Sequence, residues 1–508
     1  MLNWLLFIDF KILSMKKLSL IFTALLAVLS SNAQDSVSAH RFNDASFLPV
    51  PALSAFGGQG VSGAFAGAAG DYVLVAGGCN FPETPAAEGG QKVFYTDIYA
   101  IAADVATPSA GWSRVGSLPC ALAYGASVTT PEGVVCLGGT SDGKKSEDFA
   151  ALLTLDATGA VVSSALPPLP VNLDNFAAAY GDGFIYAAGG QHNGTPNRKA
   201  FRLKWPLPSS WFEAQTGAAW EELPDVPGPA RVQPCAVVQK GAIGSNFYLL
   251  GGFDPRYRKA VANGVYYDPR KGNWFATSLM QTHPQPPHVR EGSGSAVATN
   301  GNESLPSRGD LEAALVGASA ISSGAAHVLC FGGVNKRIFE QALDRNYQLS
   351  DTTIQTAQRL AQLREEVYYY MTQEPEWYQF RRSILVYHTI TDSWAEVFDS
   401  PLIARAGAAV VPLVSPSGTL SALVIGGEEK PGVRSADATR VDITYSAHFG
   451  WLNWTVLIVY LLGMVYLGYY FMKRASNSLT TSSRGAVAFP GGQRASAFLP
   501  RCSAPSPI

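Results

Sequence analysis

An apolar run stops at a glycine pair and continues into a charged loop in the stretch Val424-Ile425-Gly426-Gly427-Glu428-Glu429-Lys430-Pro431-Gly432-Val433-Arg434. The run predicts a buried strand, and the glycine pair predicts its end. The copy at Gly426-Gly427 is followed by two acids, a lysine and an arginine, unlike the other copies. The same combination of apolar run and glycine pair occurs at Gly77-Gly78, Gly138-Gly139, Gly189-Gly190, Gly251-Gly252 and Gly332-Gly333.

Successive glycine pairs are 61, 51, 62, 81 and 94 residues apart. A period near 50 residues, lengthened by insertions, is typical of kelch-type propellers, in which each repeat forms one four-stranded blade. In the first unit we expect strands over residues 64–69, 72–76, 97–101 and 112–119. The six units predict an all-β protein, a six-bladed kelch-type β-propeller over residues 41–446.

Two irregularities interrupt the repeat. The sixth unit has no fourth strand of its own, so we expect residues 46–51, which resemble the Pro-ended fourth strands, to supply it and close the ring. The fifth unit carries an insertion at residues 336–382, with helical spacing of apolar residues over 353–371. We expect a helical hairpin there, which packs on the rim, covers the site, or does both.

The charge balance and the first residues bear on location. A net charge of -2 gives no support to nucleic-acid binding. Met15-Lys16-Lys17, the apolar run 18–29 and Ser31-Asn32-Ala33 have the three parts of a secretory signal, so we expect residues 1–33 to direct export.

Two of the six cysteines stand in expected buried strands. Cys136 and Cys330 each precede a glycine pair by two residues, which favours buried, free thiols. A disulfide between Cys120 and Cys136 is the alternative that spacing leaves open.

An uncharged segment at residues 451–471 is long enough to cross a bilayer and is followed by Lys473-Arg474. We expect a transmembrane helix with its C-terminal side in the cytoplasm. The propeller would then face the periplasm and be anchored in the inner membrane. Residues 473–508 are rich in Ser, Ala and Arg, and we expect them to be disordered.

Charged side chains are expected to meet on one face of the disc. In an up-and-down blade, second strands end and first strands begin on the same face. This places Glu428, Arg434 and Asn335 near Arg231, Arg290 and Arg405. Several cations around one acid suit an anionic ligand.

Plainer interpretations compete with a catalytic Glu428. It could be a rim carboxylate that pairs with Lys430 or Arg434. Glu429 is its rival, although adjacent residues of an extended segment point in different directions. His283 and His288 have no third ligand at a fitting spacing, so we expect neither a metal site nor a cofactor.

Several motifs resemble the kelch-type N-acetylneuraminate epimerases, also called sialic acid mutarotases. They are Phe331-Gly332-Gly333-Val334-Asn335, Ala406-Gly407-Ala408-Ala409-Val410-Val411, Gly427-Glu428 with Lys430-Pro431-Gly432 and Arg434, residues 63–67, Thr96-Asp97-Ile98 and Ala123-Tyr124-Gly125. The order of these blocks resembles a cyclically permuted branch of the family.

The resemblance implies that the chain interconverts sialic acid anomers by ring opening. Glu428 would exchange the protons, and Arg434 would hold the substrate carboxylate or a developing oxyanion. Substrate-binding roles for Arg405, Arg231, Arg290 and Asn335 are predicted from position alone.

The apolar segment from Asn453 to Arg474 resembles the first helix of sodium/solute symporters. From Ser478 onward, a reading frame shifted by two bases permits a continuation that resembles such a transporter. We therefore expect an epimerase fused to a sialic acid symporter, with a frameshifted tail. Two other classes compete with the enzyme: a non-catalytic kelch module that binds a glycan or a protein, and a copper-dependent propeller oxidase. The seven histidines do not supply a Tyr and His ligand set for the oxidase.

Overall fold

The computed structural model describes residues 42–54, 56–104, 111–280, 314–351, 353, 355–414, 419–445 and 451–482. The chain divides into two compact units, residues 1–446 and 447–508. The predicted signal region 1–33, Arg290 and the end of the predicted tail beyond residue 482 lie outside the described residues.

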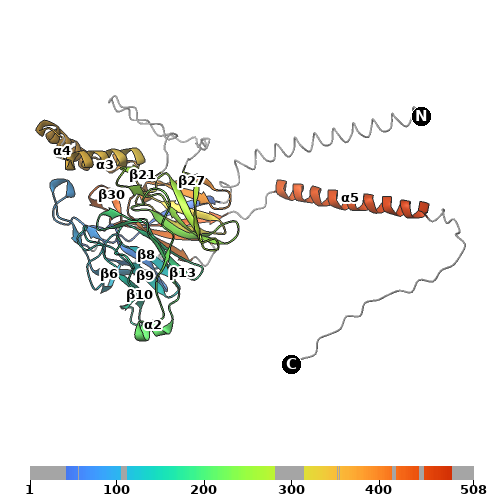
Figure 1. Cartoon of the computed structure of the whole chain (residues 1–508), viewed down its shortest axis with the longest axis horizontal. Coiled ribbons are helices and arrows are strands. Elements are labelled where there is room, and N and C mark those ends of the chain that lie inside the picture. The colour runs from blue at the N-terminus through green and yellow to red at the C-terminus, as the bar shows by residue number, and fades with distance from the viewer. Residues whose placement is uncertain are drawn as a thin grey trace. The chain divides into compact units, whose positions relative to one another are not determined.

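The first unit is built from six four-stranded antiparallel sheets (Figure 1). Blade 1 contains β2 (Phe65–Ala69), β3 (Tyr72–Ala76), β6 (Asp97–Ala102) and β7 (Ser113–Ser117). Blade 2 contains β8 (Ala126–Thr130), β9 (Gly133–Leu137), β10 (Ala150–Leu155) and β11 (Val161–Ala165). Blade 3 contains β12 (Ala177–Gly181), β13 (Phe184–Ala188), β16 (Ala200–Lys204) and β17 (Glu221–Leu223). Blade 4 contains β18 (Cys235–Lys240), β19 (Ser245–Leu250), β22 (Asn263–Asp268) and β23 (Asn273–Leu279). Blade 5 contains β24 (Ser319–Ser323), β25 (His327–Phe331), β26 (Ser383–His388) and β27 (Ser393–Asp399). Blade 6 contains β28 (Ala409–Val414), β29 (Leu420–Ile425), β32 (Ala438–Tyr445) and β1 (Phe42–Val50).

The predicted six-bladed propeller is confirmed, and the strands of the first unit lie within about one residue of the expected positions, apart from a shorter fourth strand. The second strand of each blade is the apolar run before the glycine pair, and it is almost wholly buried because apolar clusters fill the space between blades. Cys136 and Cys330 are buried free thiols as predicted, and Cys120 is also free, so the alternative disulfide is not formed.

Short elements occupy the connections between the blade strands. Four two-stranded hairpins follow second strands: β4 (Cys79–Asn80) with β5 (Val93–Phe94), β14 (Gln191–His192) with β15 (Thr195–Pro196), β20 (Phe253–Asp254) with β21 (Lys259–Ala260), and β30 (Glu428–Lys430) with β31 (Val433–Arg434). The helical turns are η1 (Ala86–Glu88), α2 (Ser209–Ala214), η2 (Pro375–Tyr378) and η3 (Pro401–Ile403).

The glycine pairs join neighbouring blades. In all six pairs both residues have positive φ, and the N–H of the second glycine donates to a carbonyl of the next blade. Gly252 donates to the Leu315 carbonyl at 2.8 Å, and Gly427 donates to the Val61 carbonyl at 3.0 Å. A Cβ on the first glycine would collide with that same carbonyl; on Gly251 it would lie 2.4 Å from the Leu315 oxygen. The pair is therefore required by close backbone approach as well as by φ.

The two ends of the propeller pair with each other. Strand β1 is the outermost strand of blade 6 and runs antiparallel to β32, with Ser46 opposite Asp442 and Val50 opposite Ala438. This confirms that an N-terminal segment supplies the missing fourth strand. Blade 6 thus has no unpaired inner strand, and the ring is closed.

The insertion in blade 5 forms two helices, α3 (Lys336–Ser350) and α4 (Ala357–Thr372). Figure 1 shows them together beside β21 and β30. Glu340 of α3 accepts from Lys259 Nζ at 2.9 Å and from the Ala260 N–H at 3.1 Å, which ties the helix to the blade 4 hairpin. Lys430 Nζ donates to the Gln373 carbonyl at 2.9 Å just after α4.

The second unit contains α5 (Trp451–Ser482). Its segment Trp454–Lys473 is, by length and composition, long and apolar enough to cross a membrane.

Replacing Gly251 by Ala is expected to destabilise the propeller by about 2–4 kcal/mol. The added Cβ collides with the Leu315 backbone, and the alanine would also have to adopt the left-handed backbone conformation of Gly251. Gly70→Ala is the matched control, since Gly70 has φ of 58° but no atom within 4 Å of its added Cβ, and it should cost about 1 kcal/mol. Urea unfolding of both variants measures the difference, and equal losses would show that close approach is unimportant.

Candidate functional site

A cavity of about 460 Å³ lies where the six first strands converge. The strands contribute mainly small side chains, such as Ala66, Ala126 and Ala177, and this leaves the centre of the ring open. Residues of the blade 5 insertion, including Phe339, Tyr370 and Phe380, complete the lining. The insertion therefore forms part of the cavity wall as well as packing on the rim of the propeller.

One residue just before each first strand adopts a left-handed conformation and lines the cavity. These residues are Gly63, Tyr124, Asn175, Gln233, Gly317 and Gly407, with φ between 51° and 67°. Tyr124 donates its N–H to the Gly63 carbonyl at 2.8 Å, and the same link continues from residue to residue as far as Gly407. Three successive blades thus present polar side chains, and the other three present glycine.

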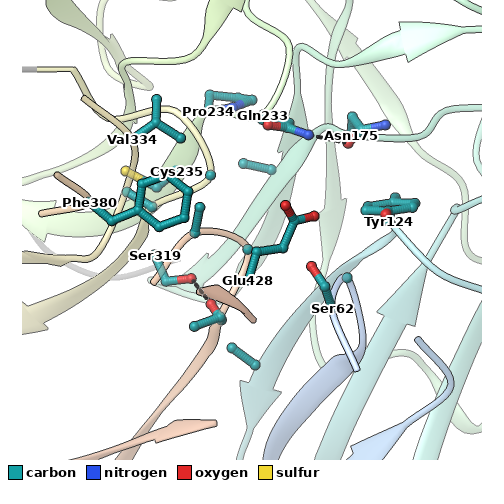
Figure 2. A pocket seen from close by; sticks show the side chains of 18 of the residues that line it. Ser62, Tyr124, Asn175, Gln233, Pro234, Cys235, Ser319, Val334, Phe380 and Glu428 are labelled. Carbon is teal, nitrogen blue, oxygen red and sulfur yellow. Dashed lines mark hydrogen bonds between the residues drawn. The ribbon is translucent and has the colours of Figure 1, made fainter. Parts of the chain in front are cut away.

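Glu428 is held at the wall of the cavity by its backbone. Its N–H donates to the Ala406 carbonyl at 2.7 Å, and its carbonyl accepts from the Ala406 N–H at 3.0 Å. The turn at Pro431-Gly432 returns the chain, so that Arg434 lies opposite Glu428 across the β30–β31 hairpin. Arg434 Nη1 is 2.8 Å from Glu428 Oε1. The predicted partners are therefore brought together, and Figure 2 shows the Glu428 carboxylate directed into the cavity.

Arg434 lies behind Glu428 and is not among the residues that line the cavity. Its side chain is 3% exposed, and the guanidinium carbon lies 5.4 Å from the centre of the Phe81 ring. Burial acts to lower the pKa of Arg434, but the Glu428 carboxylate, together with Tyr124 and Cys79, acts in the opposite direction, and the net effect raises the pKa. The ion pair therefore keeps a cation beside the carboxylate at any physiological pH.

Tyr124 stands next to the same guanidinium. Its Oη accepts from Arg434 Nη2 at 3.4 Å, from Lys92 Nζ at 3.1 Å and from Cys79 Sγ at 3.2 Å. The Lys92 ammonium also lies 4.8 Å from the centre of the tyrosine ring. Figure 2 shows Tyr124 beside Glu428 at the cavity.

A chain of amides forms the next part of the wall. Buried Asp174 accepts from Asn175 Nδ2 at 2.6 Å, and Asn175 Oδ1 accepts from Gln233 Nε2 at 3.2 Å. Because a carboxylate can only accept, this chain sets the orientation of both amides. Gln233 Oε1 is left as an acceptor at the cavity.

The predicted substrate-binding residues are placed differently from one another. Arg231 donates to the Gly251 and Asn263 carbonyls at 2.8 and 2.7 Å, and to Asn263 Oδ1. Arg405 donates to the Asp437 and Leu402 carbonyls at 2.6 and 2.8 Å. Neither lines the cavity. Both arginines are buried ties within their blades, because burial leaves backbone carbonyls that need donors.

Asn335 does line the cavity, but both ends of its amide are engaged. Its Oδ1 caps α3 by accepting from the Ile338 N–H at 3.1 Å, and its Nδ2 donates to Gln379 Oε1 at 3.2 Å. Glu429 is absent from the lining, as expected for the neighbour of an inward residue. No group of three His, Cys, Asp or Glu side chains suited to a metal occurs in the part of the chain that the structure describes.

Sequence reasoning did not single out Tyr124, Asn175 or Gln233 as site residues. A signal was present, because each left-handed residue lies 14 to 19 residues before the glycine pair of its own blade. Where glycine is replaced by a polar residue at this position, the side chain faces the cavity.

Comparison with known proteins identifies a matching protein family. The N-acetylneuraminate epimerase family matches residues 28–162 and 299–460, which make up more than half of the chain. These segments include Tyr124, Glu428 and Arg434, whereas Asn175 and Gln233 lie between them.

Individual relatives are more distant. The N-acetylneuraminate epimerase of Vibrio cholerae is 43% identical over 110 residues, covering 20% of this chain and 27% of the relative. That of Vibrio vulnificus is 26% identical over 276 residues, covering 53% and 57%. That of Yersinia enterocolitica is 27% identical over 236 residues, covering 45% and 48%. The chain thus spans between about a quarter and just over half of the length of these relatives.

A solved structure described as the structure of YjhT covers 56% of this chain and 68% of its own, at 20% identity and a TM-score of 0.39. The conclusion about the family comes from the sequence match to the family described above, not from this structure. That match covers more than half of the residues and includes Glu428 and Arg434, so the chain belongs to the N-acetylneuraminate epimerase family.

Proposed function

We propose that this protein is an N-acetylneuraminate epimerase, an isomerase that interconverts the anomers of sialic acid by opening and reclosing the sugar ring. The observation that carries the proposal is the Glu428 carboxylate at the cavity wall, with Arg434 Nη1 2.8 Å from its oxygen. The names of the relatives and of the family support the substrate.

Glu428 exchanges the proton of the anomeric hydroxyl. The Glu428 side chain is 25% exposed, so a ligand can reach its carboxylate. The two backbone hydrogen bonds with Ala406 fix the position of the residue. Positioned proton transfer of this kind contributes about 10²–10⁴ in rate, which is adequate for a reaction that also proceeds in water. Arg434 acts from behind Glu428, in place of the predicted contact with the substrate carboxylate.

The polar arc formed by Tyr124, Asn175 and Gln233 supplies hydrogen bonds to the sugar. Gln233 Oε1 is an acceptor whose direction is set by Asn175 and Asp174, so it suits a substrate hydroxyl or amide N–H. The glycines on the opposite arc leave room for the body of the ligand. No cofactor takes part in this proposal.

The first test is replacement of Glu428 by Gln, which keeps the shape of the side chain but removes its basicity. We expect the rate of anomer interconversion to fall by about 10²–10⁴. NMR signals of the anomers in freshly released sialic acid measure the rate directly. Glu429→Gln is the matched control and should retain activity.

The outcomes separate the enzyme from the competing function, a non-catalytic kelch module that binds a glycan or a protein. If the wild-type protein does not accelerate interconversion, but the immobilised protein retains sialic acid in a column experiment, the binding module is favoured. Equal rates for wild type and Glu428→Gln would remove Glu428 from the mechanism and leave the enzyme.

Arg231→Met is expected to lower stability without weakening substrate binding. The change leaves the buried Gly251 and Asn263 carbonyls without donors, at a cost of about 2–4 kcal/mol. Arg202→Met, which breaks an ion pair with exposed Glu221, should cost no more than about 1 kcal/mol. Urea unfolding gives the stabilities. A raised KM in folded Arg231→Met protein would instead restore the predicted contact with substrate.

We further propose that the propeller is exported, faces the periplasm and is anchored in the inner membrane by Trp454–Lys473, and that it supplies sialic acid to a transporter. The apolar helix supports anchoring, and the Lys473-Arg474 pair supports this orientation. The proposed cyclic permutation and symporter fusion rest on the resemblance alone.

Protease added to intact spheroplasts is expected to digest the propeller and to spare a tag placed after residue 482. Protection of the propeller, with loss of protection on lysis, would reverse the proposed orientation. For the fusion, the gene read in the shifted frame from Ser478 should continue without interruption, and an early stop codon would reject it.

A further inference from the structure

Opening a cyclic hemiketal moves two protons. The anomeric hydroxyl loses one as it becomes a carbonyl, and the ring oxygen gains one as its bond to the anomeric carbon breaks. Glu428 accounts for the first proton only. We propose that Tyr124 is the second catalytic residue, which donates its phenolic proton to the ring oxygen; this inference rests on the proposed epimerase function.

The geometry pairs the two groups through a single guanidinium. Arg434 reaches Glu428 Oε1 with Nη1 at 2.8 Å and Tyr124 Oη with Nη2 at 3.4 Å. Both side chains line the same cavity, and they lie side by side in Figure 2. An acid and a base held by one rigid, planar group keep a constant separation, as a reaction at two neighbouring oxygens requires.

The partners of Tyr124 leave its proton available. Lys92 and Arg434 carry donors only, so the phenolic oxygen accepts from both. The Cys79 thiol also donates to Oη, and its sulfur, which among the groups that contact Oη in the described part of the chain is the one able to accept, is a weak acceptor. The O–H bond can therefore turn toward a ligand in the cavity.

The same two cations prepare the site for the charge that forms. When Tyr124 gives up its proton, the resulting phenolate lies 3.1 Å from the Lys92 ammonium and 3.4 Å from the Arg434 guanidinium. Donors that are already in place stabilise such a developing anion without reorganisation. Burial raises the pKa of Tyr124 well above its usual value, with Arg434 acting in the opposite direction, so the resting phenol is protonated at neutral pH.

The proton transfers balance. In ring opening, Glu428 takes the hydroxyl proton, the bond between the anomeric carbon and the ring oxygen breaks, and Tyr124 protonates the released oxygen. The products are an open-chain ketone, a neutral glutamic acid and a phenolate. After the chain turns, the released hydroxyl adds to the other face of the ketone, returns its proton to Tyr124, and the carbonyl oxygen recovers the proton of Glu428.

Tyr124→Phe in the full-length protein tests the inference. Phenylalanine keeps the Cβ at the left-handed position and the ring packing, so the fold should be retained. We expect kcat to fall by about 10²–10⁴ with KM little changed, in the NMR assay of sialic acid anomers. Tyr95→Phe is the matched control, because Tyr95 donates to Asn80 Oδ1 at 2.7 Å, outside the cavity lining, and should leave the rate unaltered.

A fluorinated tyrosine placed at position 124 separates an acid from a merely positioning residue. Fluorination lowers the pKa of the phenol, and an acid must be protonated to work, so the decline of kcat/KM at alkaline pH should begin at lower pH than in wild type. A structural hydrogen bond would not move this limb.

Each outcome bears on one claim. A wild-type protein without activity overturns the proposed function, and the role of Tyr124 with it. An active wild type together with an unimpaired Tyr124→Phe variant overturns the role of Tyr124 alone. If Tyr124→Phe is slow but fluorination does not shift the alkaline decline of kcat/KM, Tyr124 does not donate the proton. It is then a positioning residue.

Discussion

The hydrogen bond from the second glycine of each pair to a carbonyl of the next blade is the interaction on which the site depends. It forces the end of each second strand against the beginning of the neighbouring first strand, so the loop that follows starts at the axis of the ring. In blade 6 this bond joins Gly427 to Val61, across the point where the ring closes. Glu428 is the next residue, so its position is fixed by closure of the whole propeller.

Buried arginines serve different purposes in this fold. Arg231 and Arg405 each lie two residues before a left-handed position and turn back into their own blade, where buried carbonyls accept from them. Arg434 meets a carboxylate and a phenol instead. What separates them is the acceptor within reach: neutral carbonyls make a structural tie, whereas a titratable carboxylate and phenol make a pair that can exchange protons. Charge on the side chain alone does not distinguish the two uses.

The repeat could be predicted from sequence because close backbone approach leaves no room for a Cβ, so the glycine pair recurs six times at recognisable intervals. The pairing of Glu428 with Arg434 was also predictable, since Pro431-Gly432 defines a turn between them. The fates of Arg231 and Arg405 were not, because they depend on which carbonyls remain unpaired once the blades have packed. Tyr124 was hidden for a related reason: its neighbours Lys92 and Cys79 come from a different blade, and only the folded ring brings them together.

Closure of the ring also sets the order in which the protein can mature on the ribosome. Thr444 contacts Asp44 across 400 residues of sequence, and closing a loop of that length costs on the order of 5 kcal/mol in chain entropy. The first strand to be synthesised must therefore wait, unpaired, until nearly the entire propeller has been translated. Glu428 and Arg434 belong to the same late segment. A prematurely terminated chain without this late segment would lose both the β1–β32 pairing that closes the ring and the proposed catalytic pair. An open, partly active intermediate is therefore not expected to accumulate.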